Sequence, residues 1–337
     1  MDFLTRSIVA RPVSWALLSF AASTAFGSAA NAKEPSYPDH AITWVVPFAV
    51  GGPTDGLARL LAQRVAVELD QPIVVQNFAG AGGTVGAGRT ARVKPDGYTL
   101  FVGHIGTMAA APYLFKSLKY DPNEDFDAVF RFPDTPMALL VKKDSPFNTA
   151  SELLEEARKR PGALSFGTAG VGSSSHLAAE HLASVAKAKF TFVPYKGTGP
   201  AMTDLIGGQL DAMLDQANVS LPQVEGGLLK ALAMTSQSPM PQFPGVPTLA
   251  EGELPGFLAS TWYGLYAPAG TPVHVTESLQ AAYMRALADQ KFTDSLKKLG
   301  IEVLPADMVT ASALTAFTQS EQKKWQQIIN DAGIEPQ

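Results

Sequence analysis

The sequence contains no cysteine, and only 17% of its 337 residues are charged. The absence of cysteine excludes disulfide bridges, thiolate zinc sites, a thiol nucleophile and a lipid-anchored N-terminal cysteine. The net charge is −5, and no run of like charges forms a basic patch. Because affinity for nucleic acid comes from clustered lysine and arginine, we expect no nucleic-acid partner.

Long apolar stretches are also missing. Beyond the first 32 residues, none reaches the roughly 18 residues that a transmembrane helix needs. The N-terminal segment has Arg6 and Arg11, a short apolar run over 15–25, and a small-residue motif at 30–32. This pattern is typical of a secretory signal peptide, whereas the run is too short for a membrane anchor. We therefore predict a signal peptide over 1–32, cleavage after Ala32 and a periplasmic mature protein.

Hydrophobic residues make up 46% of the chain, enough for globular cores, and the length suggests two domains. From residue 41 onward, apolar β-rich runs alternate with helical patterns. This alternation predicts an α/β protein with parallel sheets covered by helices on both faces, and its repetition predicts two lobes. A proline-rich connector is expected at 237–257. The predicted strands are 42–48, 73–75, 98–102, 137–141, 164–166, 190–194, 212–214 and 262–267; the main predicted helices are 55–69, 150–160, 173–186, 200–206, 274–290 and 308–331.

Motifs for catalysis, nucleotides or metals are weak or absent. The run 86–91 fits a loose dinucleotide fingerprint, but it begins too far after the preceding strand, and no phosphate P-loop motif exists. No G-x-S-x-G motif surrounds the serines at 173–175, which we expect to cap a helix. His176 and His181 lie about 140° apart on a helix and cannot share a metal ion. We therefore predict no cofactor, no metal site and no enzymatic activity.

Four turns share a composition of glycine, serine and threonine at the end of a predicted strand. They lie at 51–55, 103–107, 168–174 and 195–200. In open α/β sheets, ligands bind beyond the carboxyl ends of strands, where helix N-termini present N–H groups and a positive dipole. Lys196 is the only lysine or arginine in the four turns. We predict that they surround a cleft between the lobes, in which backbone N–H groups and hydroxyls hold an anion.

From about Tyr37 to Gly333 the chain resembles the extracytoplasmic solute receptors of tripartite tricarboxylate transporters, the Bug family. This resemblance implies a type II periplasmic-binding-protein fold, with two doubly wound lobes and a ligand cleft and hinge between them. It also implies capture of a small di-, tri- or aromatic carboxylate for delivery to inner-membrane permease subunits. The motifs that carry it are Val46-Pro47-Phe48, Asp55-Gly56-Leu57-Ala58-Arg59, Gly80-Ala81-Gly82-Gly83, Pro95-Asp96-Gly97-Tyr98, Gly167-Thr168-Ala169-Gly170, Val193-Pro194-Tyr195-Lys196-Gly197, Asp204-Leu205-Ile206-Gly207-Gly208, Val246-Pro247-Thr248-Leu249 and Trp262-Tyr263-Gly264-Leu265-Tyr266-Ala267-Pro268.

The resemblance assigns 33–137 plus 250–337 to lobe one and 138–249 to lobe two, and we expect a monomer. Carried over position by position, it places ligand contacts in the first loop, in two loops of the second lobe and after the strand 212–214. Three further turn residues complete the predicted site. The implied contacts are Phe48, Gly51, Gly52, Thr54, Asp55, Thr168, Ser173, Ser174, Tyr195 and Asp215, and the turn residues are His104, Thr107 and Gly172.

Some positions depart from the family pattern. His104 stands where small or apolar residues are commoner, Met108 stands where a polar residue is frequent, and the run 216–218 is unusual. The family therefore leaves the identity of the carboxylate open. We hypothesise that His104 adds a donor that becomes charged between about pH 8 and 6 and strengthens binding. Two other functions stay open, an exported hydrolase and a receptor that presents its ligand to a sensor protein.

Overall fold

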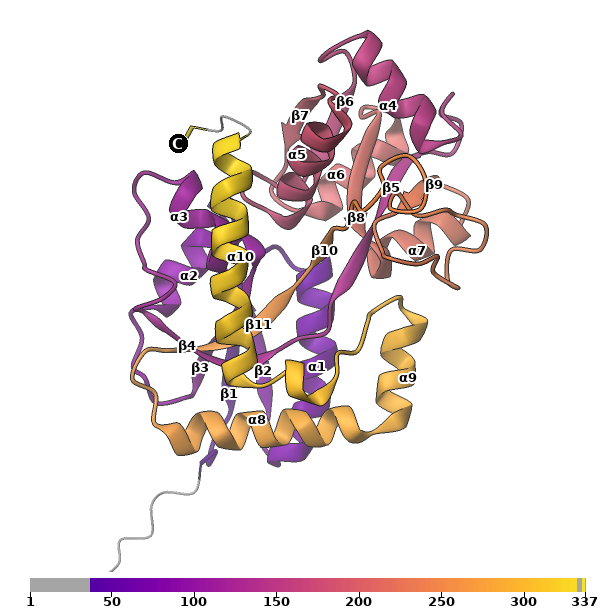
Figure 1. The fold of residues 1–337 in the computed structure, drawn as a ribbon. Helices are drawn as coiled ribbons and strands as arrows, with labels where there is room; N and C mark the ends of the chain where they lie inside the picture. Colours follow the sequence, from indigo (N-terminus) through magenta and orange to yellow (C-terminus); the bar gives the residue numbers. More distant parts are fainter. Residues whose placement is uncertain (1–36, 332–334, 337) are drawn as a thin grey trace, which may run out of the picture. The chain divides into compact units, whose positions relative to one another are not determined.

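The structure is a computed structural model, and it describes residues 37–331 and 335–336. The predicted signal peptide and its cleavage site lie outside the described residues. In the described part of the chain, no helix is long and apolar enough to cross a membrane. Strands and helices alternate along this part, as the sequence pattern predicts (Figure 1).

The first sheet has the strand order β2-β1-β3-β11-β4. Strand β1 pairs in parallel with both β2 and β3, so that Trp44 lies beside Val75 on one side and Leu100 on the other. Strand β11 runs antiparallel to β3 and β4 and comes from a distant part of the sequence. The bounds are β1 Ile42–Val46, β2 Ile73–Asn77, β3 Thr99–His104, β4 Phe126–Arg131 and β11 Tyr263–Pro268.

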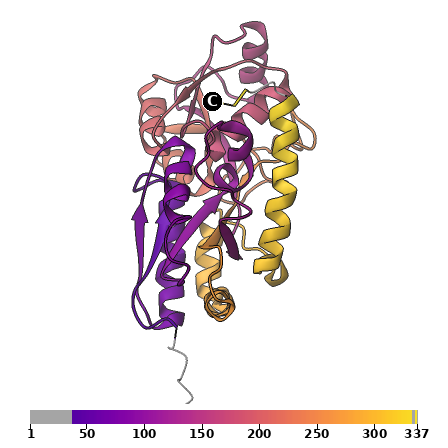
Figure 2. The ribbon, with the colours of Figure 1, turned by 90° about the vertical axis from the view of Figure 1, so that its left-hand side faces the viewer.

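Helices cover both faces of this sheet because successive strand residues point to opposite sides. Trp44 packs in one buried cluster with residues of α1 and α8, and Val45 packs in another with residues of α2 and α10. In Figure 2 the indigo helix α1 overlaps the first strands at the left of the view, and the yellow helix α10 lies at the right. The bounds are α1 Pro53–Leu69, α2 Thr84–Thr90, α3 Ala111–Leu114, α8 Val273–Ala288, α9 Gln290–Lys298 and α10 Ala311–Asp331, with short 3-10 turns at Ala81–Gly83 and Ala306–Met308 and a π-helical turn at Ile105–Ala110.

The second sheet has the strand order β10-β5-β8-β6-β7, and β9 pairs with β5. Strands β6, β7 and β8 are parallel to one another, whereas β5 is antiparallel to β8 and β9. Phe166 and Leu214 lie in its buried core. The bounds are β5 Thr135–Lys142, β6 Ser165–Thr168, β7 Thr191–Pro194, β8 Ala212–Gln216, β9 Leu229–Met234 and β10 Ser260–Thr261, and the helices are α4 Ala150–Lys159, α5 Ser174–Ala186, α6 Thr198–Gly207 and α7 Ala217–Glu225.

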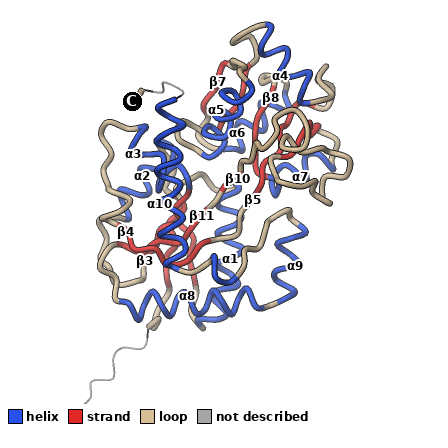
Figure 3. The backbone as a smooth tube through the Cα atoms, in the orientation of Figure 1, coloured by secondary structure: helices blue, strands red, loops and turns tan. Residues whose placement is uncertain are grey.

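The chain passes between the two sheets twice, between Arg131 and Thr135 and again between Thr261 and Tyr263. The two crossings lie side by side, because β10 pairs antiparallel with the start of β5 (Figure 3). The α/β class with two sheets is confirmed, but both sheets are mixed rather than parallel, because β11 and β5 run antiparallel to their neighbours. Strands β4, β9 and β10 were not predicted, because they are short or carry charged residues. The lobe boundaries at 137 and 250 stay a prediction.

Candidate functional site

A cavity of about 60 Å³ lies between loops that follow strands of both sheets. From the first sheet come the loop after β1 and the start of α1, together with Tyr263 of β11. From the second sheet come the loops that follow β6 and β7 and the last residues of β8. The residues that line this cavity, here called the cleft, are Phe48, Ala49, Val50, Gly52, Pro53, Thr54, Ala169, Ser173, Ser174, Ser175, Gly197, Thr198, Gly199, Pro200, Asp215, Gln216 and Tyr263.

Four helices begin at the cleft. The residues that precede the first turns of α1, α5, α6 and α7 are Gly52, Ser173, Gly197 and Gln216, and all four line it. Ser173 accepts a hydrogen bond from the backbone N–H of His176, whereas the other three make no side-chain cap bond. N–H groups of a first helical turn have no acceptor within their own helix, so this arrangement concentrates donors and positive dipole ends around one small space.

The described residues that line the cleft include no lysine, arginine or histidine, and Asp215 is their one acid. Oδ1 of Asp215 accepts from the backbone N–H of Gln216 at 2.8 Å and from Oγ1 of Thr198 at 3.4 Å. Oδ2 is buried without a partner. Burial raises the pKa of Asp215 to about 7, against the opposite effect of these two hydrogen bonds. The carboxyl group can therefore remain neutral beside an anion near neutral pH.

A chain of hydroxyl groups connects the two sheets at the cleft. Oγ1 of Thr54 donates to Oη of Tyr263 at 3.1 Å, and Oη of Tyr263 donates to Oε1 of Gln216 at 2.9 Å. All three side chains are buried. The ends of α1 and α7 are thus linked through β11.

Asp55 holds the first loop in place. It accepts hydrogen bonds from the backbone N–H of Gly51 at 2.9 Å, from Nδ2 of Asn77 at 2.9 Å and from Nε of Arg59 at 3.0 Å. Burial alone would raise the pKa of Asp55, but Arg59 and the hydrogen bonds outweigh it and lower the pKa. The loop residue Gly51 has a φ of +81°, which favours glycine.

His104 is fully buried and lies outside the cleft lining. Its Nδ1 accepts from the backbone N–H of Gly106 at 2.9 Å, and its backbone N–H donates to Oγ1 of Thr107. Burial lowers the pKa of His104 to about 3, although the backbone of Gly82 acts in the opposite direction. The hypothesis that His104 becomes charged between pH 8 and 6 is therefore wrong, because desolvation keeps the ring neutral.

The other predicted residues divide into two groups. Phe48, Gly52, Thr54, Ser173, Ser174 and Asp215 line the cleft, whereas Gly51, Asp55, His104, Thr107, Thr168, Gly172 and Tyr195 do not. Tyr195 faces elsewhere because its hydroxyl donates to Asp204 at 2.6 Å, and the side chain of Thr168 is completely buried. Ligand contact by any of these residues stays a prediction.

Four polar lining residues, Ser175, Thr198, Gln216 and Tyr263, were not among the predicted site residues. Gln216 carried a signal, because it begins the run that departs from the family pattern. Tyr263 sits inside a resemblance motif, but its contact with the loop after β8 depends on tertiary structure. Thr198 belongs to one of the four predicted turns and was overlooked in favour of Tyr195.

Loops of the two sheets also touch directly. A Cβ atom on Gly82 would lie 2.2 Å from the carbonyl oxygen of Val171, and one on Gly106 would lie 2.0 Å from the carbonyl oxygen of Gly172. Real Cβ atoms do not approach so closely, so these two glycines permit the loops to meet. The loops after β2 and β3 of the first sheet therefore lie against the loop after β6 of the second.

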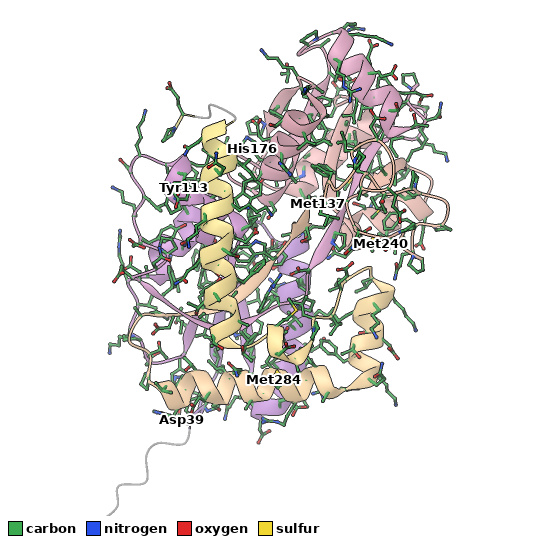
Figure 4. The ribbon with its side chains drawn as sticks, viewed as in Figure 1. Asp39, Tyr113, Met137, His176, Met240 and Met284 are labelled. Carbon is green, nitrogen blue, oxygen red and sulfur yellow. The ribbon has the colours of Figure 1, made fainter. Side chains whose placement is uncertain are left out.

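A second, larger cavity of about 800 Å³ also has walls from both halves of the chain. Its walls include the segment 235–242, the segment 300–303, Trp262 and one side of α10. Met240, labelled in Figure 4, belongs to this lining. Its charged residues are Arg131, Lys297 and Lys324 with Asp134, Glu302 and Glu321. No group of three or more potential metal ligands occurs among the described residues.

Two sheets joined by two crossings, with helix N-termini around a cleft between their loops, define the class of two-lobed solute-binding proteins. The family model for the receptor of the tripartite tricarboxylate transporter family, TctC, matches residues 57–334. The solved periplasmic binding protein BugD is 39% identical, with a TM-score of 0.84 over 89% of this chain and 100% of that chain.

Two further solved structures resemble the chain closely. MatC from Rhodopseudomonas palustris, solved with bound malate, is 39% identical, with a TM-score of 0.82 over 87% of this chain and 100% of that chain. Another R. palustris protein, solved with adipate, is 32% identical, with a TM-score of 0.84 over 89% of this chain and 100% of that chain. The chain belongs to the tripartite tricarboxylate transporter receptor family, also called the Bug family. This family consists of periplasmic solute-binding receptors, which confirms the expectation of a binding protein rather than an enzyme.

Proposed function

We propose that this receptor binds a small aliphatic dicarboxylate in the cleft and delivers it to a membrane permease of the tripartite tricarboxylate type. The observation that carries the proposal is the convergence of four helix N-termini on one cavity. Backbone N–H groups and helix dipoles stabilise carboxylates without a cationic side chain. The cation-poor lining therefore suits an anion rather than a neutral ligand or a cation.

The size of the cleft favours a short ligand. Its volume of about 60 Å³ is well below the roughly 150 Å³ of an engineered cavity that holds benzene. A bulky tricarboxylate, or the rigid ring of an aromatic acid, would need the lining loops to move further apart than a slim linear chain does. A linear dicarboxylate needs the smallest expansion. The relatives solved with malate and with adipate support the same ligand class.

A binding panel tests the ligand class. Purified receptor is titrated with succinate, malate and adipate, with benzoate as a rigid, planar comparator and citrate as a larger one. A ligand that binds only the folded state stabilises it by about 2.7 kcal/mol at a concentration of 100 Kd, so a true ligand raises the melting temperature by several degrees. Stabilisation by benzoate or citrate, with none by the dicarboxylates, would contradict the proposal.

Delivery to a permease needs a separate measurement. Cells that lack this receptor should lose uptake of the radiolabelled dicarboxylate, and a plasmid copy should restore it. Full uptake without the receptor, together with a lost transcriptional response to the ligand, would favour presentation to a sensor protein instead.

A further inference from the structure

Gln216 occupies the junction between β8 and α7. It is the last residue of the strand and the residue that precedes the first turn of the helix. Only 4% of its surface is exposed, and it lines the cleft. Because Gln216 lines the cleft, its side-chain amide is one of the polar groups that can contact a ligand there.

The orientation of this amide follows from the hydroxyl chain. A tyrosine hydroxyl carries a single hydrogen, which Tyr263 donates to Oε1 of Gln216 at 2.9 Å. Thr54 in turn donates its hydrogen to Tyr263 at 3.1 Å. Burial raises the pKa of Tyr263 well above its usual range, so the hydroxyl keeps its proton. With its oxygen held by Tyr263, the amide presents its NH2 group on the opposite side.

That NH2 group has no protein partner. Among the hydrogen bonds of the described residues, the side chain of Gln216 only accepts one, from Tyr263, and Nε2 donates none; Oδ2 of the neighbouring Asp215 is buried without a partner. Nε2 of Gln216 is not among the fully buried unpartnered atoms, so it can reach the space of the cleft, whereas the buried Oδ2 of Asp215 calls for an explanation such as a bound ligand or water. The free NH2 group of Gln216 is therefore available to a ligand in the cleft.

We propose that Gln216 is a specificity-determining residue of the cleft. Its Nε2 donates a hydrogen bond to a carboxylate or hydroxyl oxygen of the ligand, and Tyr263 and Thr54 are positioning residues that fix the amide. This assignment rests on the proposed function. It explains how a lining without a cation selects an oxygen-rich anion, because the amide offers a directed donor where a flipped amide or a glutamate would offer an acceptor.

The main test compares three variants by calorimetry with succinate and malate. Gln216→Met removes the donor and should raise Kd about tenfold to hundredfold, as expected for a hydrogen bond to a charged group. Gln216→Glu keeps an oxygen for Tyr263 but turns an acceptor toward the ligand, so it should raise Kd more than about hundredfold. Gln223→Met makes the same change on the same helix away from the cleft and should leave Kd unchanged.

A double-mutant cycle tests the positioning role. Tyr263→Phe should raise Kd about threefold to tenfold in the wild-type background and have no further effect in Gln216→Met, because the two residues act as one unit. An equal loss in both backgrounds would show that Tyr263 acts only through packing, and would overturn its assignment. Circular dichroism and melting curves establish whether each variant is folded. If Gln216→Met does not fold, the Kd values of Gln216→Glu and Tyr263→Phe test the assignment of Gln216.

The outcomes separate the two proposals. If wild type binds succinate or malate and the Gln216 variants bind equally well, the assignment of Gln216 fails and the proposed function stands. If wild type binds neither dicarboxylate, the proposed function fails, and the assignment fails with it.

Discussion

Trp262 and Tyr263 are neighbours in the sequence, yet their side chains line two different cavities. Trp262 lines the large cavity of about 800 Å³, and Tyr263 lines the cleft of about 60 Å³. Because successive residues of an extended chain point to opposite sides, this single segment separates the two spaces. Ser174 contributes to both. The cavities therefore lie next to each other, and they differ both in volume and in the chemistry of their walls.

The large cavity has the charges, but two of its cations already have partners. Nη2 of Arg131 donates to both carboxylate oxygens of Asp134, at 3.0 and 2.7 Å. Lys324 pairs with Glu321 at 3.2 Å, and the other carboxylate oxygen of Glu321 accepts from the indole N–H groups of Trp262 and Trp325. Cations that are paired in this way have little left to offer an incoming anion.

The cleft shows the opposite arrangement. Its described lining has no cation, but it gathers helix N-termini and the unpartnered polar atoms of Asp215 and Gln216. If the cleft binds an anion as proposed, free donors rather than the number of positive charges distinguish it from the large cavity. Substitutions in the loops near the cleft, at the carboxyl group of Asp215 and at a hydroxyl of the lining test this difference between the two cavities.

The largest effect is expected at Gly82. A Cβ atom there would lie 2.2 Å from the carbonyl oxygen of Val171, and backbone on both sides of this contact cannot easily give way. Gly82→Ala should therefore keep the loops apart. Because apparent affinity falls with the population of the binding-competent form, we expect Kd for succinate to rise by more than about hundredfold in calorimetry.

The control for Gly82→Ala is Gly227→Ala. Gly227 also has a left-handed φ, +66° against +60° for Gly82, but a Cβ atom there would meet nothing within 4 Å. Both variants should lose about 1 kcal/mol of unfolding free energy through backbone strain. Only Gly82→Ala should lose affinity, and equal affinities in the two variants would show that contact between the loops is not needed for binding.

The next effect concerns pH and the carboxyl group of the cleft. Burial raises the folded-state pKa of Asp215 from 3.8 to about 7. The neutral carboxyl group therefore stabilises the fold at low pH, and the unfolding free energy falls as pH rises from 3.8 to about 7. Above this pH the ionised carboxylate also repels an anionic ligand. We expect the affinity for succinate to fall about tenfold between roughly pH 6 and pH 8.

Two variants assign this pH dependence. Asp215→Asn cannot ionise and should bind with the same affinity at both pH values. His104→Gln should keep the wild-type slope, because burial already lowers the pKa of His104 to about 3. A flat profile in His104→Gln, with the slope retained in Asp215→Asn, would restore the original hypothesis about His104.

The smallest effects are expected from single hydroxyls and solvent-exposed cations. Ser174 lines the cleft, and Ser174→Ala should raise Kd about threefold to tenfold through the loss of one hydrogen bond. Lys196→Met and Lys324→Met should change Kd less than about twofold, because one lysine is exposed outside the cleft and the other is paired. If Lys196→Met abolished binding and Ser174→Ala had no effect, a cation rather than the hydroxyl groups would hold the ligand.

The sequence predicted more of the fold than of the site. Regular spacing of apolar residues gave helix 55–69, and the structure has α1 at Pro53–Leu69. Strands β9 and β10 were not predicted, because each forms by pairing with β5 and neither has a strong strand pattern in its own sequence. The turns gave Ser173 and Ser174, which line the cleft, but they also gave Tyr195, whose hydroxyl is bound by Asp204.

By itself, the sequence determined the α/β alternation, the family and the shortage of cations in the strand-to-helix turns, because these follow from local composition and order. Only the tertiary structure decided which turn residues face the cleft, that His104 stays neutral, and that Tyr263 orients the amide of Gln216. The physical reason is that burial and hydrogen-bond direction depend on neighbours far away in the sequence. Tyr263 is 209 residues from Thr54 and 47 from Gln216, and no local pattern encodes their meeting.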